Sequence, residues 1–296
     1  MQHTLLEILK KATDFLGRYG VENPRLDAEV MLARILGLER IHLYVQFDRP
    51  LDRDELDRYR EAVVRRARGA PVAYITGVRE FMSLEFRVAP GVLIPRPETE
   101  LSVEQAIACL EHFRKRGNDS PTMIDIGTGS GAIACAVAYH APWSRVLAVD
   151  ISEQALRIAR GNVESLGLEN RVTLIKSDLY SSVPADWLGA CVIASNPPYI
   201  PTADIPKLQR EISEHEPSIA LDGGSDGLDV YRRLAAGAKR VLSASGFIVL
   251  EVGDGQADDV GAILTGAGLS DVEVEKDLAG IGRVVVACAE GGVARD

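Results

Sequence analysis

The stretch Thr122–Gly131, with the sequence T-M-I-D-I-G-T-G-S-G, decides the fold of this chain. Its first half is an apolar run, and its second half is a glycine-rich turn that leads into a second apolar segment, residues 131–140. Glycines let the backbone approach a ligand closely, and the helix that follows presents free N–H groups. The stretch therefore predicts a strand over 122–126, a helix over 131–140 and a ligand-binding turn between them.

The same alternation of strand and helix continues to the end of the chain. It predicts an α/β fold, a Rossmann-like seven-stranded sheet that is mostly parallel, with helices on both faces. In such a sheet, ligands bind beyond the carboxyl ends of the strands. The predicted strands are 122–126, 145–149, 172–176, 191–195, 246–252, 272–276 and 283–289, and the predicted helices are 101–115, 131–140, 153–165 and 228–243.

Residues 1–70 have a different pattern. Apolar side chains recur there at helical spacing, a proline follows Asn23, and a highly charged stretch runs from Asp52 to Arg68. These features predict a small N-terminal helical domain that carries no chemical motif of its own. Residues 71–95 are predicted to form a short hairpin and linker, and residues 96–290 to form the sheet domain.

Composition restricts the possible partners. The chain has 296 residues and a net charge of −10, and residues 76–296 hold 20 Lys and Arg against 31 Asp and Glu. That balance argues against stable binding to nucleic acid. The cysteines show no C-x-x-C spacing, no His/Cys metal constellation is present, and no apolar run approaches about 18 residues. We therefore expect a cytoplasmic protein with no metal and no membrane span.

The glycine turn and two acidic strand ends indicate a nucleotide-like cofactor. The turn also fits the pattern G-x-G-x-x-G/A, so it does not by itself distinguish a nicotinamide cofactor from S-adenosylmethionine. Asp150 follows the strand 145–149 and can accept hydrogen bonds from both ribose hydroxyls of either cofactor. Its alternative role is to cap the next helix, which Ser152 could do instead. Asp178 could accept from the exocyclic amine of adenine while Leu179 packs on the ring, although a loop aspartate is equally compatible with the sequence. The residues of the turn itself are Gly127, Thr128, Gly129, Ser130 and Gly131.

Four residues, Asn196-Pro197-Pro198-Tyr199, directly follow the apolar run 191–195. Two prolines cannot continue a central strand, so the chain must leave the sheet there. The Asn196 side-chain oxygen and the Pro197 carbonyl can each accept one hydrogen of a planar –NH₂ group. Tyr199 can lie against the flat face of that group. The motif therefore predicts a site that holds an amino or amide nitrogen for methylation.

The order of these motifs resembles that of class I S-adenosylmethionine-dependent methyltransferases that modify amino nitrogens. Further stretches are similar to the peptide chain release factor N5-glutamine methyltransferases, the PrmC or HemK family, over about residues 70–288. These stretches are Arg79–Phe81, Ile94–Glu100 (I-P-R-P-E-T-E), Glu216-Pro217 with Ala220-Leu221, Gly223–Leu228 and Leu250–Gly253 (L-E-V-G).

The resemblance implies a specific reaction and specific contacts. It implies that the turn Gly127–Gly131, Asp150, Leu179 beside Asp178, and Asn196 contact S-adenosylmethionine, which becomes S-adenosyl-L-homocysteine. It implies that residues 196–199 hold the glutamine of the Gly-Gly-Gln motif of class I release factors. We further expect the helical domain to recognise that protein substrate. Leu179 stands where some relatives carry an aromatic residue, which leaves the strength of adenine stacking open.

Two other functions fit parts of the pattern. An adenine-N6 methyltransferase would use the same N-P-P-Y grip on a flipped base, but the acidic sheet domain argues against it. A non-catalytic cofactor-binding or ribosome-associated module would not need both the cofactor and the substrate motifs. The sequence offers no evident general base, since neither His140 nor His215 belongs to a motif.

Overall fold

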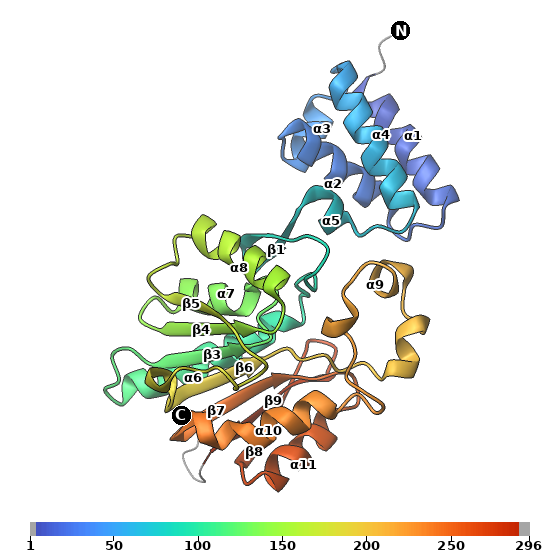
Figure 1. The fold of residues 1–296 in the computed structure, drawn as a ribbon. Coiled ribbons are helices and arrows are strands. Elements are labelled where there is room, and N and C mark those ends of the chain that lie inside the picture. Colours follow the sequence, from blue (N-terminus) through green and yellow to red (C-terminus); the bar gives the residue numbers. More distant parts are fainter. Residues whose placement is uncertain (1–3, 290–296) are drawn as a thin grey trace. The chain divides into compact units, whose positions relative to one another are not determined.

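The computed structural model describes residues 4–289 and divides the chain into two units (Figure 1). The first unit comprises the residues up to Val78 together with the later segment Leu208–His215, and the second comprises Arg79–Lys207 and the residues from Glu216 onward. The sequence pattern did not indicate that a segment near residue 210 belongs with the N-terminal helices. Residues 1–3 of the predicted helical domain and residue 290, the predicted end of the sheet domain, lie outside the described residues.

The first unit is helical and has its own core. Leu5 and Leu16 are fully inaccessible to solvent, and Tyr59 is nearly so. Two helices begin with capping boxes, in which the side chain of Thr4 or Asp52 accepts from the third residue of the helix. The helices are α1 (Leu5–Arg18), α2 (Pro24–Leu36), α3 (Arg40–Val45), α4 (Arg53–Ala67), α5 (Val72–Thr76) and α9 (Arg210–Ser213).

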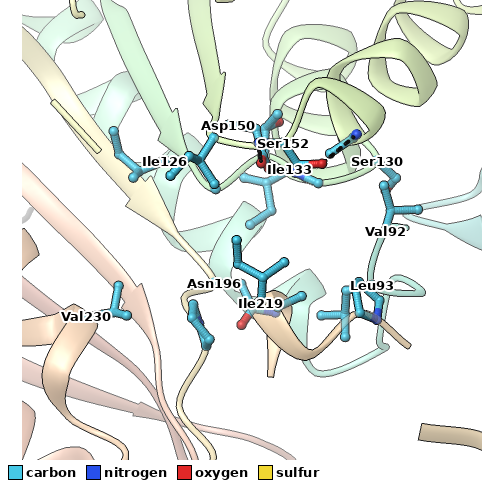
Figure 2. A pocket seen from close by; sticks show the side chains of 18 of the residues that line it. Val92, Leu93, Ile126, Ser130, Ile133, Asp150, Ser152, Asn196, Ile219 and Val230 are labelled. Atoms are coloured by element: carbon cyan, nitrogen blue, oxygen red, sulfur yellow. Dashed lines mark hydrogen bonds between the residues drawn. The ribbon is translucent and has the colours of Figure 1, made fainter. Parts of the chain in front are cut away.

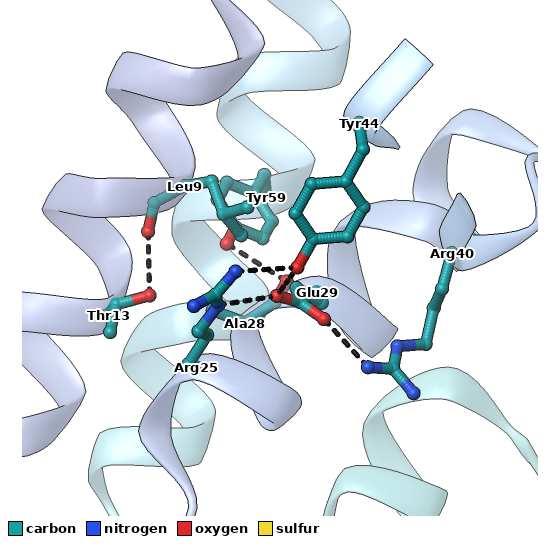
Figure 3. Close-up of polar contacts among 8 residues, drawn as sticks. All are labelled: Leu9, Thr13, Arg25, Ala28, Glu29, Arg40, Tyr44 and Tyr59. Atoms are coloured by element: carbon teal, nitrogen blue, oxygen red, sulfur yellow. Dashed lines mark hydrogen bonds and ion pairs between the residues drawn. The ribbon is translucent and has the colours of Figure 1, made fainter. Parts of the chain in front are cut away.

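A buried acid joins α2 to α3 (Figure 3). Glu29 is 2% exposed and accepts from Arg25 at 2.9 Å, from Arg40 at 2.7 Å and from the Tyr44 hydroxyl. Burial raises the pKa of Glu29, but these three hydrogen bonds outweigh burial and hold the pKa below its usual value. A single buried carboxylate therefore fixes the position of the short helix α3.

A seven-stranded sheet forms the second unit, with the strand order β5-β4-β3-β6-β7-β9-β8. The five strands from β5 to β7 are parallel, and β9 pairs antiparallel with both β7 and β8. A separate two-stranded hairpin, β1 (Val78–Phe81) and β2 (Leu84–Arg87), precedes it in the chain. The strands are β3 (Thr122–Ile126), β4 (Arg145–Asp150), β5 (Val172–Lys176), β6 (Ala190–Ser195), β7 (Leu242–Glu251), β8 (Ser270–Lys276) and β9 (Gly282–Cys288).

Helices cover both faces of this sheet, as the alternation predicted. Successive strand residues point to opposite faces, so Met123 packs in one core while its neighbour Ile124 packs in the other. The first core contains side chains of α6 (Thr99–Lys115), α7 (Ala132–His140) and α8 (Glu153–Ser165), and the second contains those of α10 (Asp229–Val241) and α11 (Ala257–Gly266). The four cysteines are buried in the second unit and form no disulfide.

The structure corrects several element boundaries. The helix predicted over 228–243 ends at Val241, because Leu242 already pairs with Ala190 as the start of β7. Val241 and Leu242 are both apolar, so hydrophobicity does not mark the point at which the helix gives way to the strand. Asp150 is the last residue of β4 rather than the residue after it. The helices α3, α5, α9 and α11 were not predicted, and α5 lies within residues 71–95, which were expected to form a hairpin and linker. None of the helices within residues 4–289 is long and apolar enough to cross a membrane.

The third glycine of the turn, Gly131, is required by packing. Its φ is +81°, and an added Cβ would lie 3.2 Å from the Cβ of Ala159 on α8. We expect Gly131→Ala to lower the free energy of unfolding by at least about 1 kcal/mol, because it combines left-handed strain with a close contact. Chemical denaturation of the full chain measures the change.

A matched control is Gly266→Ala at the end of α11. Gly266 has an ordinary φ, and a Cβ added there would meet nothing within 4 Å. That variant should be neutral or stabilising by up to about 1 kcal/mol. Equal stabilities of the two variants would contradict the packing role of Gly131.

Candidate cofactor and substrate site

A cavity of about 480 Å³ lies where β3, β4 and β6 end (Figure 2). Figure 2 shows that its wall combines apolar side chains, such as Ile126 and Val92, with a few polar ones. This composition is typical of a small-molecule site. Most of the predicted cofactor residues line this cavity, namely Gly127, Thr128, Gly129, Ser130, Asp150, Asp178, Leu179 and Asn196. Gly131 does not line it, but caps α7 directly behind the turn.

Hydrogen bonds to β4 hold the glycine turn in place. The N–H groups of Gly127 and Thr128 both donate to the Val149 carbonyl at 2.9 Å, and the Gly129 N–H donates to Asp150 Oδ2 at 2.8 Å. The φ angles of Gly127 and Gly129 are +73° and +57°, in the left-handed region that glycine adopts without strain. The turn is therefore rigid before any ligand binds.

Asp150 has the geometry of an acceptor rather than a helix cap. Its Oδ1 accepts from the Ser152 N–H at 2.8 Å, while the Ser152 side chain itself caps α8 by accepting from Ala155. Each carboxylate oxygen has two lone pairs, so both oxygens keep acceptor capacity on the cavity side. Burial raises the pKa of Asp150, and the backbone hydrogen bonds oppose that rise.

The other acid of the turn, Asp125, has a structural role. It is inaccessible to solvent, and its Oδ2 accepts from Thr128 Oγ1 at 2.6 Å and from the Ala134 N–H at 3.2 Å. Burial raises its pKa to about 7. Because it does not line the cavity, it supports the turn from beneath.

Asp178 and Leu179 lie at the cavity with a feature the sequence did not indicate. Both oxygens of Asp178 accept from Arg233 Nη2 on α10, at 2.7 and 2.8 Å. Leu179 has a φ of +47°, a strained conformation for a branched side chain. Ser177 holds that conformation, since its hydroxyl donates to the Leu179 carbonyl at 2.8 Å. Arg233 therefore shares the acid that was predicted to bind adenine.

The N-P-P-Y segment leaves the sheet after Ser195, whose hydroxyl donates to the Ile126 carbonyl at 2.7 Å. Asn196 and Pro198 line the cavity, whereas Pro197 is buried and Tyr199 is half-buried, and neither lines it. Gln256 holds the Tyr199 carbonyl at 3.0 Å. Burial raises the pKa of Tyr199 to about 12, so its phenol stays protonated at neutral pH.

Three further segments line the cavity without having been assigned to it. Residues 91–93 come from the predicted linker, residues 217–220 follow Glu216, and Thr99 begins α6. An ion pair between Arg96 and the buried Glu216 joins the first two regions. Asn162 on α8 connects the hairpin to the turn, with hydrogen bonds to the backbone of Arg87 and to the Ser130 carbonyl. The I-P-R-P-E-T-E and Glu216-Pro217 stretches were the available sequence signals.

Two family models match this chain. The PrmC N-terminal domain matches residues 7–77, and the methyltransferase small domain matches residues 105–224. The chain is 43% identical over 282 residues to the release factor glutamine methyltransferase of Geobacter sulfurreducens, with 95% of each chain covered. The proteins of the same name from Rhodopirellula baltica and Moorella thermoacetica are each 42% identical over 285 residues, with at least 95% of each chain covered.

The chain belongs to the release factor glutamine methyltransferase family. This confirms the resemblance drawn from the I-P-R-P-E-T-E and N-P-P-Y stretches. Both family models fall on parts of the chain that the sequence had assigned to different domains, one helical and one α/β.

Solved structures show the same fold at low sequence identity. A methyltransferase from Pyrococcus furiosus has a TM-score of 0.50 at 19% identity, covering 70% of this chain and 89% of its own. The hMettl16 catalytic domain, solved in complex with a MAT2A 3'UTR hairpin, has a TM-score of 0.55 at 16% identity, covering 82% of this chain and 84% of its own. These similarities establish the class I methyltransferase fold.

We expect Asp150→Ala to weaken S-adenosylmethionine binding by at least tenfold, or about 1.4 kcal/mol. The variant loses both carboxylate oxygens that would accept from the ribose hydroxyls, and it loses the hydrogen bond from the Gly129 N–H that holds the turn. Turnover at saturating cofactor should fall much less. Titration calorimetry measures the affinity, with the exposed Asp119→Asn as a control of similar charge loss. Unchanged affinity in Asp150→Ala would contradict the ribose-binding role.

Proposed function

We propose that this protein transfers a methyl group from S-adenosylmethionine to the side-chain amide nitrogen N5 of the glutamine in the Gly-Gly-Gln motif of class I peptide chain release factors. The observation that carries the proposal is the position of Asn196, which lines the cavity together with the glycine turn and Asp150. In this proposal, the residue that binds the amide, Asn196, and the residue that binds the ribose, Asp150, therefore line the same cavity. Family membership supports the choice of glutamine over adenine.

The residues that line the cavity suit S-adenosylmethionine in their chemistry. Asp150 offers acceptors for the ribose hydroxyls, the turn Gly127–Gly131 allows close approach of the amino acid part, and Ile126 and Leu179 offer apolar surfaces for adenine. Gly127 lines the cavity, and a Cβ added to it would meet no protein atom within 4 Å. The space beside this glycine is therefore open to a ligand. When bound, S-adenosylmethionine supplies a methyl group on a positively charged sulfur. S-adenosyl-L-homocysteine is the expected product.

The substrate amide requires orientation and polarisation. A carboxamide nitrogen is a poor nucleophile because its lone pair is delocalised into the carbonyl. In our proposal, Asn196 Oδ1 and the Pro197 carbonyl accept the two hydrogens of the amide, which directs the nitrogen and stabilises the positive charge that develops on it. Pro198 and Tyr199 complete the binding site for the glutamine side chain.

Neither His140 nor His215 acts as a base in this mechanism. His140 is exposed and lies beside the Met82 carbonyl, and His215 belongs to the segment 208–215 of the helical unit. The methylated nitrogen is strongly acidic until it loses its proton, so that proton can pass to water after transfer. Positioning and electrostatics therefore carry the reaction.

Asn196→Ala should reduce methyl transfer by at least about a hundredfold while the fold is retained, because a single lost acceptor of this kind costs roughly 2.7–4 kcal/mol of transition-state stabilisation. The measurement is transfer of labelled methyl to purified release factor, followed by mass spectrometry of the Gly-Gly-Gln peptide. Adenine-containing DNA serves as the alternative substrate.

The exposed Asn170→Ala is the matched control and should keep wild-type activity. Near-wild-type transfer by Asn196→Ala would refute the mechanism. Methylation of DNA but not of the release factor by the wild-type protein would refute the proposed substrate.

We also propose that the helical unit, with residues 1–70 at its centre, recognises the body of the release factor. Helix α3 exposes a group of apolar side chains that the core does not use, with Ile41 61% and Val45 68% exposed. Phe47, which follows the helix, is also exposed. Such a group suits a protein partner better than a polyanion. A cytoplasmic location is proposed as well, since four buried cysteines that form no disulfide are typical of proteins in a reducing compartment.

Replacing both Ile41 and Val45 by serine should lower kcat/KM on whole release factor by about tenfold, the effect of losing a small apolar contact worth roughly 1.4 kcal/mol. Activity on a short Gly-Gly-Gln peptide should not change, because the peptide lacks the recognised surface. Steady-state kinetics with both substrates tests this. Equal losses on the two substrates would argue against a recognition role.

A further inference from the structure

A buried carboxyl group lies behind the amide-binding asparagine. Parallel pairing of β6 with β7 places Ser195 opposite Leu250, so Asn196, which follows β6, and Glu251, which ends β7, lie side by side. Thr99, the first residue of α6, completes the group. Asn196 Nδ2 donates to Thr99 Oγ1 at 3.2 Å, and the carboxyl of Glu251 is hydrogen-bonded by the side chains of Thr99 and Asn196.

Glu251 supports the cavity without touching it. Asn196 and Thr99 line the cavity, but Glu251 does not, and it is 2% exposed. Its Oε2 has no hydrogen-bond partner among residues 4–289. The nearby Arg283 forms its ion pair with Asp277 instead, at 3.0 Å. A buried carboxyl that is only partly satisfied costs stability, so its presence here calls for a functional reason.

The hydrogen-bond chain has a direction that an ionised Glu251 imposes. A carboxylate can only accept, so the Thr99 hydroxyl and Asn196 Nδ2 must both donate to it, and the Thr99 oxygen also accepts from Asn196 Nδ2. This leaves Asn196 Oδ1 for the cavity. The flipped amide would set its oxygen against Thr99 and Glu251 and would present an –NH₂ group to the substrate –NH₂, donor against donor.

We propose that Glu251 is a positioning residue for methyl transfer, which acts both directly and through Thr99 to fix the Asn196 amide with its oxygen toward the substrate. This inference rests on the proposed function, since it assumes that Asn196 accepts from the substrate amide. The negative charge of Glu251 behind that amide also favours the positive charge that develops on the substrate nitrogen.

The inference predicts a pH dependence. Burial raises the pKa of Glu251 to about 7, with Glu98 adding to the rise and with Thr99, Arg283 and Asn196 opposing it. Tyr199 and Tyr231 also face the group, and both stay neutral because burial raises their pKa values. Below pH 7 a protonated Glu251 can donate to Thr99, and the direction of the chain is lost. Turnover should therefore fall as the pH drops through about 7.

The test compares Glu251→Gln with wild type between pH 6 and 9, at saturating S-adenosylmethionine and Gly-Gly-Gln peptide. We expect Glu251→Gln to lower kcat at least tenfold at pH 8 and to lose the dependence on pH near 7, while cofactor affinity stays within about twofold. The pKa of Asp125 is also raised to about 7, so a pH dependence of the wild type alone would not identify Glu251. Its loss in Glu251→Gln would. Asp119→Asn should keep the wild-type profile.

Two Thr99 variants test the hydrogen bonds that Thr99 makes between Glu251 and Asn196. Thr99→Val removes one of the two hydrogen-bond routes from Glu251 to Asn196 and should lower kcat by more than threefold, whereas Thr99→Ser keeps the hydroxyl and should stay within about threefold of wild type. These variants also decide the question if Glu251→Gln fails to fold. They require no change to a buried charge.

The outcomes separate the inference from the function on which it rests. If the wild-type protein does not methylate the peptide or the release factor, the proposed function is refuted and the inference with it. If wild type is active and Glu251→Gln and Thr99→Val keep its kcat and pH profile, only the inference is refuted. A parallel loss of cofactor affinity and thermal stability in these variants would also refute it, since that pattern indicates a structural role alone.

Discussion

Parallel pairing of β3 with its two neighbours is the constraint on which the site depends. Ile126, the last residue of β3, lies opposite Val149 of β4 and Ser195 of β6, so the carboxyl ends of the three strands are in register. Gly127 and Asn196, which follow β3 and β6, and Asp150, which ends β4, are therefore brought to one cavity although up to 69 residues of chain separate them. Backbone hydrogen bonds of the sheet, rather than contacts among the site residues, set these positions.

Hydrogen bonds from side chains then make that edge rigid. Asp150 ties down the glycine turn, the Ser195 hydroxyl bonds to the Ile126 carbonyl, and Asn162 joins the turn to the hairpin. The proposed ribose-binding residue Asp150 and the proposed amide-binding residue Asn196 are thus positioned by different hydrogen bonds. A site whose geometry is set before binding loses less free energy to ordering when substrate arrives. The strained Leu179 shows where this rigidity opposes local preference.

Much of the fold and the family could be predicted from the sequence, because the relevant signals are local. The stretch Thr122–Gly131 predicted its strand, turn and helix, and the seven predicted strands correspond to the seven of the sheet. The boundary at Leu242 was wrong because the apolar pair Val241-Leu242 is compatible both with the end of a buried helix and with the start of a buried strand. The segment 208–215 carried no local signal for its place with the helical unit, where Glu211 pairs with the buried Arg66.

The sequence by itself determined the α/β class, the family, the glycine turn and the order of the acidic strand ends, since each depends on neighbouring residues. Only the tertiary structure decided which side chains stand behind these motifs. Arg233 reaches Asp178 from a helix 55 residues away, and Glu251 reaches Asn196 and Thr99 across a strand pairing and a helix start. Such contacts leave no recurring pattern in the sequence, because they arise from the register of the sheet and the packing of the helices.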